Sequence, residues 1–151
     1  MTDPKIRPLD PTAAAVLERP YWTGSGLVFS AEHLAAQLEA GRFARPGVFV
    51  LIADDRDGAP EVVAVGPLGE LAATAARLAE HWRHGVAFVH RDDALGSAHT
   101  AWLSAHLTDL LNPRLGPEER APLHGPGEAA RAELAVFANK IRATLTKSGF
   151  I

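Results

Sequence analysis

The chain has 151 residues, a net charge of −3 and no cysteine, which excludes disulfides and metal sites built on thiolates. Its longest apolar run, residues 48–53, is too short to span a bilayer, and no signal-peptide pattern is present. We therefore expect one cytoplasmic domain, residues 1–151, with no membrane partner. The negative charge argues against a general nucleic-acid binder.

Residues 1–45 are expected to form an N-terminal extension of this domain. The prolines within residues 1–10 favour an extended or loosely packed segment. Asp10 followed by Pro11 is a typical helix start, so a short helix is expected over residues 11–19.

The rest of the extension is predicted to hold a strand and a helix. Residues 21–29 favour a strand that Gly24 and Gly26 interrupt. Ser30 is expected to cap a helix over residues 31–40 that ends at Gly41.

Residues 46–111 are expected to form the core of the domain. Two apolar runs, residues 47–53 and 60–66, flank a polar turn and predict a hairpin. Because these runs are nearly continuous rather than alternating, both faces of the hairpin are expected to be covered. Residues 85–90 predict a third strand.

Three helices are predicted around these strands. Helical spacing of apolar residues predicts helices over residues 69–82, 96–111 and 128–147, and the last of these belongs to a C-terminal segment of residues 128–151. The Pro- and Gly-rich residues 112–127 are expected to form a loop. The predicted fold is thus α/β, of the α+β kind: a central three-stranded antiparallel sheet flanked by helices, with an N-terminal extension and a long C-terminal helix.

The order of motifs resembles the GIY-YIG nuclease family. That family has G-[IV]-[YF] in the first hairpin strand, x-[IV]-G at the end of the second, and R-L-x-x-H on the next helix. The corresponding residues here are Gly47-Val48-Phe49, Ala64-Val65-Gly66 and Arg77-Leu78-Ala79-Glu80-His81.

The resemblance extends over nearly the whole chain, to a small bacterial branch of that family. This branch carries W-T-G before its first strand, S-K-D-D-x-L-x-x-A-H-x-x-Y-L-E after its third, and a closing L-G-[FY]. The matching residues are Trp22-Thr23-Gly24, the stretch from His90 to Leu95 with Ala98-His99 and Trp102-Leu103, and Ser148-Gly149-Phe150.

The resemblance implies a fold but also a loss of catalytic groups. The family cuts phosphodiesters with one Mg²⁺, two tyrosines, an arginine and a metal-binding glutamate. The two tyrosine positions fall at Phe49 and Ala64, and the arginine falls at Arg77. The glutamate falls at Ser104, whose neutral hydroxyl is a poor Mg²⁺ ligand. We therefore expect no cofactor and no bound metal.

Two histidines complete the set of candidate cleft residues. His81 follows Arg77 on the helix, and His99 stands at the A-H pair of the branch. His99 is also interpreted as a packed core histidine, and Arg77 as a solvated surface residue. His99 and His106 lie two turns apart, ~10 Å along a helix axis, which is too far for one metal ion.

Three functional hypotheses follow from these residues. The leading one is a GIY-YIG-fold protein that lacks metal-dependent nuclease activity and uses its scaffold for binding or other chemistry. The second is an atypical enzyme, acting on a small anionic or phosphate-containing substrate through Arg77, His81, His99 or Ser104, or still active as a DNA endonuclease. The third is an interaction protein, for example a homodimer. Weak or no binding of nucleic acid is expected.

Overall fold

The computed structural model describes residues 5–8, 15–18, 22–41, 43–54, 58–90, 97–114 and 127–151. It is a mixed α/β structure built on one antiparallel sheet, in the order β1-β2-β3-β6-β4-β5. The strands are β1 (Lys5–Pro8), β2 (Ala15–Glu18), β3 (Gly24–Ser30), β4 (Gly47–Asp54), β5 (Pro60–Pro67) and β6 (His84–His90).

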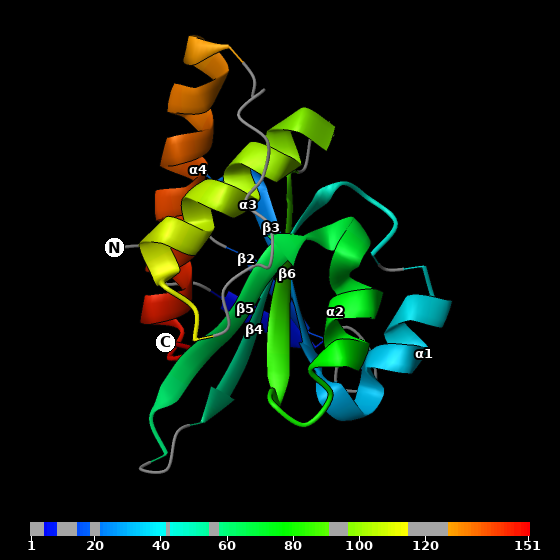
Figure 1. Ribbon diagram of the computed structural model, residues 1–151. Helices are drawn as coiled ribbons and strands as arrows, with labels where there is room; N and C mark the ends of the chain where they lie inside the picture. The colour runs from blue at the N-terminus through cyan, green and yellow to red at the C-terminus, as the bar shows by residue number, and fades with distance from the viewer. Residues whose placement is uncertain are drawn as a thin grey trace.

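Helices cover both faces of this sheet (Figure 1). The described helices are α1 (Leu34–Glu39), α2 (Leu71–Arg77), α3 (Ser97–Leu111) and α4 (Glu128–Lys147), and short 3-10 turns over Ala31–His33 and Leu68–Glu70 lead into the first two. Helices α3 and α4 lie on one side of the sheet, and α1 and α2 on the other. No helix among the described residues is long and apolar enough to cross a membrane.

The predicted hairpin and third strand lie side by side in the sheet. Strand β4 pairs with β5 on one side and with β6 on the other, both antiparallel. The sheet is larger than the three strands expected, because the N-terminal residues add β1, β2 and β3 to it. Strand β3 joins the two parts through its pairing with β6, from Gly24 opposite His90 to Ser30 opposite His84.

The prediction of a short helix over residues 11–19 is wrong for the part of that range that the structure describes. Residues Ala15–Glu18 form β2, which pairs with β1 on one edge and with β3 on the other. The side chain of Leu17 is fully buried. Two ladders of backbone hydrogen bonds and this burial outweigh the helix propensity of an alanine-rich stretch, which is only a weak preference. Residues 11–14 lie outside the described residues.

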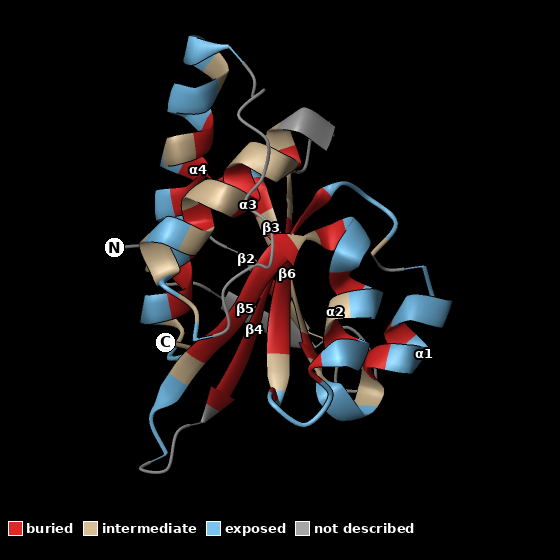
Figure 2. Cartoon of the chain, viewed as in Figure 1, coloured by how far each residue is buried: buried red, intermediate tan, exposed pale blue. Residues whose placement is uncertain are grey.

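Two hydrophobic cores sandwich the sheet, as the continuous apolar runs of the hairpin predict. Along β4, Val48 and Val50 face α3 and α4, whereas Phe49 and Leu51 face α1 and α2. All four side chains are fully buried. Buried residues therefore run through the sheet and the inner sides of the helices, and exposed residues lie outside (Figure 2).

A bulge in the hairpin fixes which side chains of β5 face which core. Leu51 pairs with Ala64 and the next residue, Ile52, pairs with Val62, so Val63 has no opposite residue on β4. Val63 and its neighbour Ala64 both contribute to the core under α2. The extra residue of a bulge breaks the strict alternation of faces along a strand in this way.

The helix expected over residues 31–40 is present as a 3-10 turn followed by α1. The Ser30 hydroxyl accepts a hydrogen bond from the backbone N–H of His33, at 3.3 Å, as expected of a capping serine. Gly41 has a φ of +71°, the left-handed conformation that commonly follows a helix and favours glycine.

The helix predicted over residues 69–82 is shorter than expected, because α2 ends at Arg77. The indole N–H of Trp82 donates to the carbonyl oxygen of Ala75 at 3.4 Å, so a side chain satisfies one carbonyl of the last turn. Trp82 is itself buried against Phe29, with ring centroids 5.9 Å apart. Trp82 thus packs into the core from the turn that connects α2 to β6. Helices α3 and α4 agree with expectation within one residue, and most of the expected loop 112–127 lies outside the described residues.

Candidate functional site

The two positions that correspond to the family tyrosines lie inside the core under α2. Phe49 on β4 is fully buried, and Ala64 on β5 is 5% exposed. Both belong to the same hydrophobic core, together with Leu71 of α2 and Trp82. The structure therefore brings these two positions to one face of the sheet, but it packs them against other side chains and not into an open cleft.

Gly66, the last residue of the second motif, is held in place by the ring of Phe49. Gly66 lies opposite Phe49 in the hairpin. A Cβ atom at position 66 would lie 2.8 Å from the Cζ atom of Phe49 and 2.9 Å from its Cε2 atom. Only a residue without a side chain fits beneath this ring, so the glycine of the motif has a packing role here.

Arg77 lies at the C-terminal end of α2, His81 follows it, and both side chains are exposed. Arg77 is the last residue of α2. His81 is not on the helix, as expected, but in the turn that follows it, where its N–H donates to the carbonyl of Leu78 at 2.8 Å. Both residues are exposed, and neither belongs to the core that contains Phe49 and Ala64.

Ser104 lies on the opposite side of the sheet from the two tyrosine positions. It is buried on α3 at 7% exposed, between Leu103 and Leu107 of the other core. Its carbonyl accepts a hydrogen bond from the Thr108 hydroxyl at 2.8 Å. The structure therefore does not bring Ser104 together with Phe49 and Ala64.

The histidines of α3 have separate surroundings. His99 is half-buried in the first turns of the helix and lines a cavity beside α4. His106 stacks on Trp102, one turn away, with ring centroids 4.9 Å apart and planes 10° from parallel. No described group of three or more His, Asp or Glu side chains is arranged to hold a metal ion.

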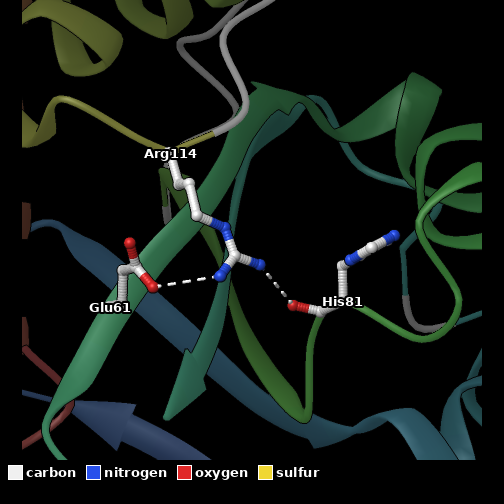
Figure 3. Close-up of polar contacts among 3 residues, drawn as sticks. All are labelled: Glu61, His81 and Arg114. Atoms are coloured by element: carbon white, nitrogen blue, oxygen red, sulfur yellow. Dashed lines mark hydrogen bonds and ion pairs between the residues drawn. The ribbon is translucent and has the colours of Figure 1, made fainter. Parts of the chain in front are cut away.

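Arg114 makes polar contacts with the hairpin and with the turn that follows α2 (Figure 3). Its guanidinium pairs with the Glu61 carboxylate of β5 at 3.2 Å and donates to the His81 carbonyl at 3.5 Å. Its backbone N–H donates to the carbonyl of Val62 at 2.9 Å. Arg114 thus ties the residues after α3 to the edge strand and to the turn before β6. It was not among the residues singled out by sequence, because these contacts are non-local.

A small hollow of about 240 Å³ lies on the α2 side of the sheet, beyond Phe49. Ala87, which pairs with Phe49, lines it together with Leu68 and Arg45. The Arg45 guanidinium donates to the carbonyl of His90. None of the six candidate cleft residues lines this hollow.

A larger cavity of about 440 Å³ lies between α3, α4 and the adjoining ends of β3 and β6. Of the candidate residues, only His99 lines it. Trp22, His90, Phe137 and Lys140 also line it, and sequence reasoning missed them as a group. Trp22 is buried in the core, but nothing in the sequence indicates that α4 packs beside it.

Comparison of the chain with protein-family models, with curated proteins and with solved structures finds no match.

Proposed function

We propose that this chain is a GIY-YIG-like domain that does not cleave nucleic acid and that acts by binding. The observation that carries this proposal is the position of the motif residues. Phe49 and Ala64 are packed beneath α2, and Ser104 is buried on α3, on the other side of the sheet. A nuclease needs its activating and metal-binding groups around one phosphate.

The side chains at these positions also lack the required chemistry. Phenylalanine and alanine have no hydroxyl to help activate water. Ser104 is a neutral residue in an apolar layer, whereas Mg²⁺ is held by carboxylates and water. The residues present therefore do not fit the metal that the resemblance implies, and we derive no catalytic step through it.

The packing around Phe49 supports a specialised role for phenylalanine at this position. A tyrosine hydroxyl would be attached to Cζ, the ring atom that lies closest to Gly66. It would be buried in an apolar core, where an unsatisfied hydroxyl costs about 1–3 kcal/mol. The core is thus adapted to the residue that the chain has, and not to the catalytic one.

The alternative of an atypical enzyme finds less support in the geometry. Arg77 and His81 are exposed at and just after the end of α2, Ser104 is buried on α3, and His99 lines a cavity beside α4. These four groups do not surround one substrate-sized space. We place the protein in the cytoplasm, and homodimerisation is compatible with the binding role.

Incubation of labelled duplex DNA with Mg²⁺ or Mn²⁺ tests the proposal. We expect no cleavage, and only weak, salt-sensitive binding of the duplex, because the net charge of −3 disfavours contact with phosphates. Metal-dependent cleavage that Arg77→Ala abolishes would overturn the proposal. Sub-micromolar affinity for the duplex at physiological salt would restore a nucleic-acid role.

A further inference from the structure

The cavity beside α4 has the size and position of a small-molecule site. Its volume of about 440 Å³ falls within the range of ligand pockets, roughly 300–1,000 Å³. It lies on the α3 and α4 side of the sheet, away from Phe49 and Ala64. A ligand site in this cavity is therefore independent of whether the chain cleaves nucleic acid.

Aromatic rings form the inner wall of this cavity. The ring centroids of Trp22 and Phe137 are 5.5 Å apart, and those of His90 and Phe137 are 5.8 Å apart. Trp22 and Phe137 are each only 7% exposed, so this wall is held by the core. Val136, 58% exposed, contributes an apolar side chain to the lining. Such a wall favours a flat, apolar ligand body that packs against rings.

The charged groups of the cavity are separated along α4. Glu133 and Lys140 are both exposed and both line the cavity, one turn before and one turn after Phe137. Seven residues of helix separate them by ~10 Å along the axis. An anionic group is therefore attracted to the Lys140 end and repelled from the Glu133 end, which fixes the orientation of a ligand.

The wall also holds a hydrogen-bond donor that the described residues leave unused. The indole Nε1–H of Trp22 is buried and has no acceptor among them. A buried donor without an acceptor is costly. Trp22 lines the cavity with its ring, but this nitrogen is itself buried and does not face the open space.

We propose that this cavity binds a small planar aromatic molecule that carries one anionic group. The ring system packs against the wall formed by Trp22, His90 and Phe137. The anionic group lies at the Lys140 end of the cavity.

Calorimetric titration with three probes tests this proposal. 1-Naphthoate has both features, 1-naphthamide has the ring system without the charge, and cyclohexanecarboxylate has the charge without the aromatic ring. We expect saturable binding of 1-naphthoate, with 1-naphthamide about fivefold weaker, as for the loss of one partly exposed charge pair. Cyclohexanecarboxylate is expected to bind more weakly than 1-naphthoate, because it cannot stack.

Variants of α4 test where in the cavity the ligand binds. Lys140→Ala should weaken 1-naphthoate about fivefold and leave 1-naphthamide unchanged, whereas Lys147→Ala, on the same helix outside the cavity, should change neither. Ala130→Phe should fill the cavity and abolish binding of both aromatic probes. Its matched control is Ala132→Phe, at an exposed position that does not line the cavity.

Thermal unfolding of each variant checks that it folds. Val136→Glu, at an exposed position, adds a negative charge to the cavity lining and is a second way to repel the anion. The proposal fails if 1-naphthoate does not saturate the native protein or if cyclohexanecarboxylate binds as tightly. It also fails if folded Ala130→Phe or Val136→Glu binds 1-naphthoate as the native protein does.

Discussion

Gly66 and Phe49 form one packing unit near the open end of the hairpin, where they lie opposite each other. The ring of Phe49 occupies the space that a side chain at position 66 would need. Phe49 is on β4, which is held between β5 and β6, whereas Gly66 is on the edge strand β5. The packing of the motif glycine and that of the aromatic residue opposite it therefore depend on each other.

Gly66→Ala should destabilise the fold by about 1–3 kcal/mol, the usual cost of overpacking a core. Urea unfolding measures this change, and Gly69→Ala is the matched control, since a Cβ at Gly69 meets no atom within 4 Å. Phe49→Leu combined with Gly66→Ala should cost less than the sum of the two single changes. Equal stability of Gly66→Ala and Gly69→Ala would show that the ring is not closely packed on position 66.

Single residues were predictable where local rules decide their role. The Ser30 cap and Gly41 follow from short-range hydrogen bonding and backbone conformation, and both agree with the structure. The cavity residues Trp22 and Phe137 were not predictable as neighbours. They are far apart in the sequence and meet only because α4 packs on the sheet beside β3.

Element predictions succeeded where periodicity is strong and failed where partners decide. The buried hairpin, β6, α3 and α4 carry clear patterns and lie where expected. Strand β2 was predicted as a helix, because local propensity does not take its pairing with β1 and β3 into account. The bulge at Val63 is equally hidden in the sequence, although it decides the face on which Ala64 lies.

The contacts of Arg114 connect three elements, but we expect their energetic contribution to be small. The side chains of Arg114 and Glu61 are 42% and 36% exposed, so solvent screens the pair. Arg114→Ala should lower the free energy of unfolding by less than ~1 kcal/mol. The backbone hydrogen bond to Val62 remains in this variant.

A double-mutant cycle with Glu61→Gln isolates the ion pair, because neither change removes a buried side chain. The coupling should fall further at high salt. A loss of several kcal/mol in Arg114→Ala would instead mean that this arginine holds the edge of the sheet in place.

At the scale of the molecule, function depends on which face of the sheet each residue occupies. Sequence patterns predicted the hairpin, β6 and the four described helices, but neither the six-stranded sheet nor the assignment of helices to its faces. Helices α2 and α3 lie on opposite sides, so Arg77 and Ser104 are on helices that do not share a face (Figure 1). The candidate cleft was thus defined by motif order, and the structure distributes its members over both cores and the surface.

The absence of cysteine from the chain allows a direct measurement of this arrangement. Single cysteines at Ala64, Ser104 and Arg77 can be compared for their rate of modification by a maleimide. Alanine and serine are close to cysteine in size, so these changes preserve the cores. Modification in urea gives the rate for each unfolded chain.

We predict that Ala64→Cys and Ser104→Cys react at least ~100-fold more slowly in the native protein than in urea, since access requires the cores to open. Arg77→Cys, at an exposed position, should react at nearly the same rate in both. Fast native modification of both Ala64→Cys and Ser104→Cys, in folded protein, would contradict the account. It would mean that the two motif positions line an open cleft, as they would in an active nuclease.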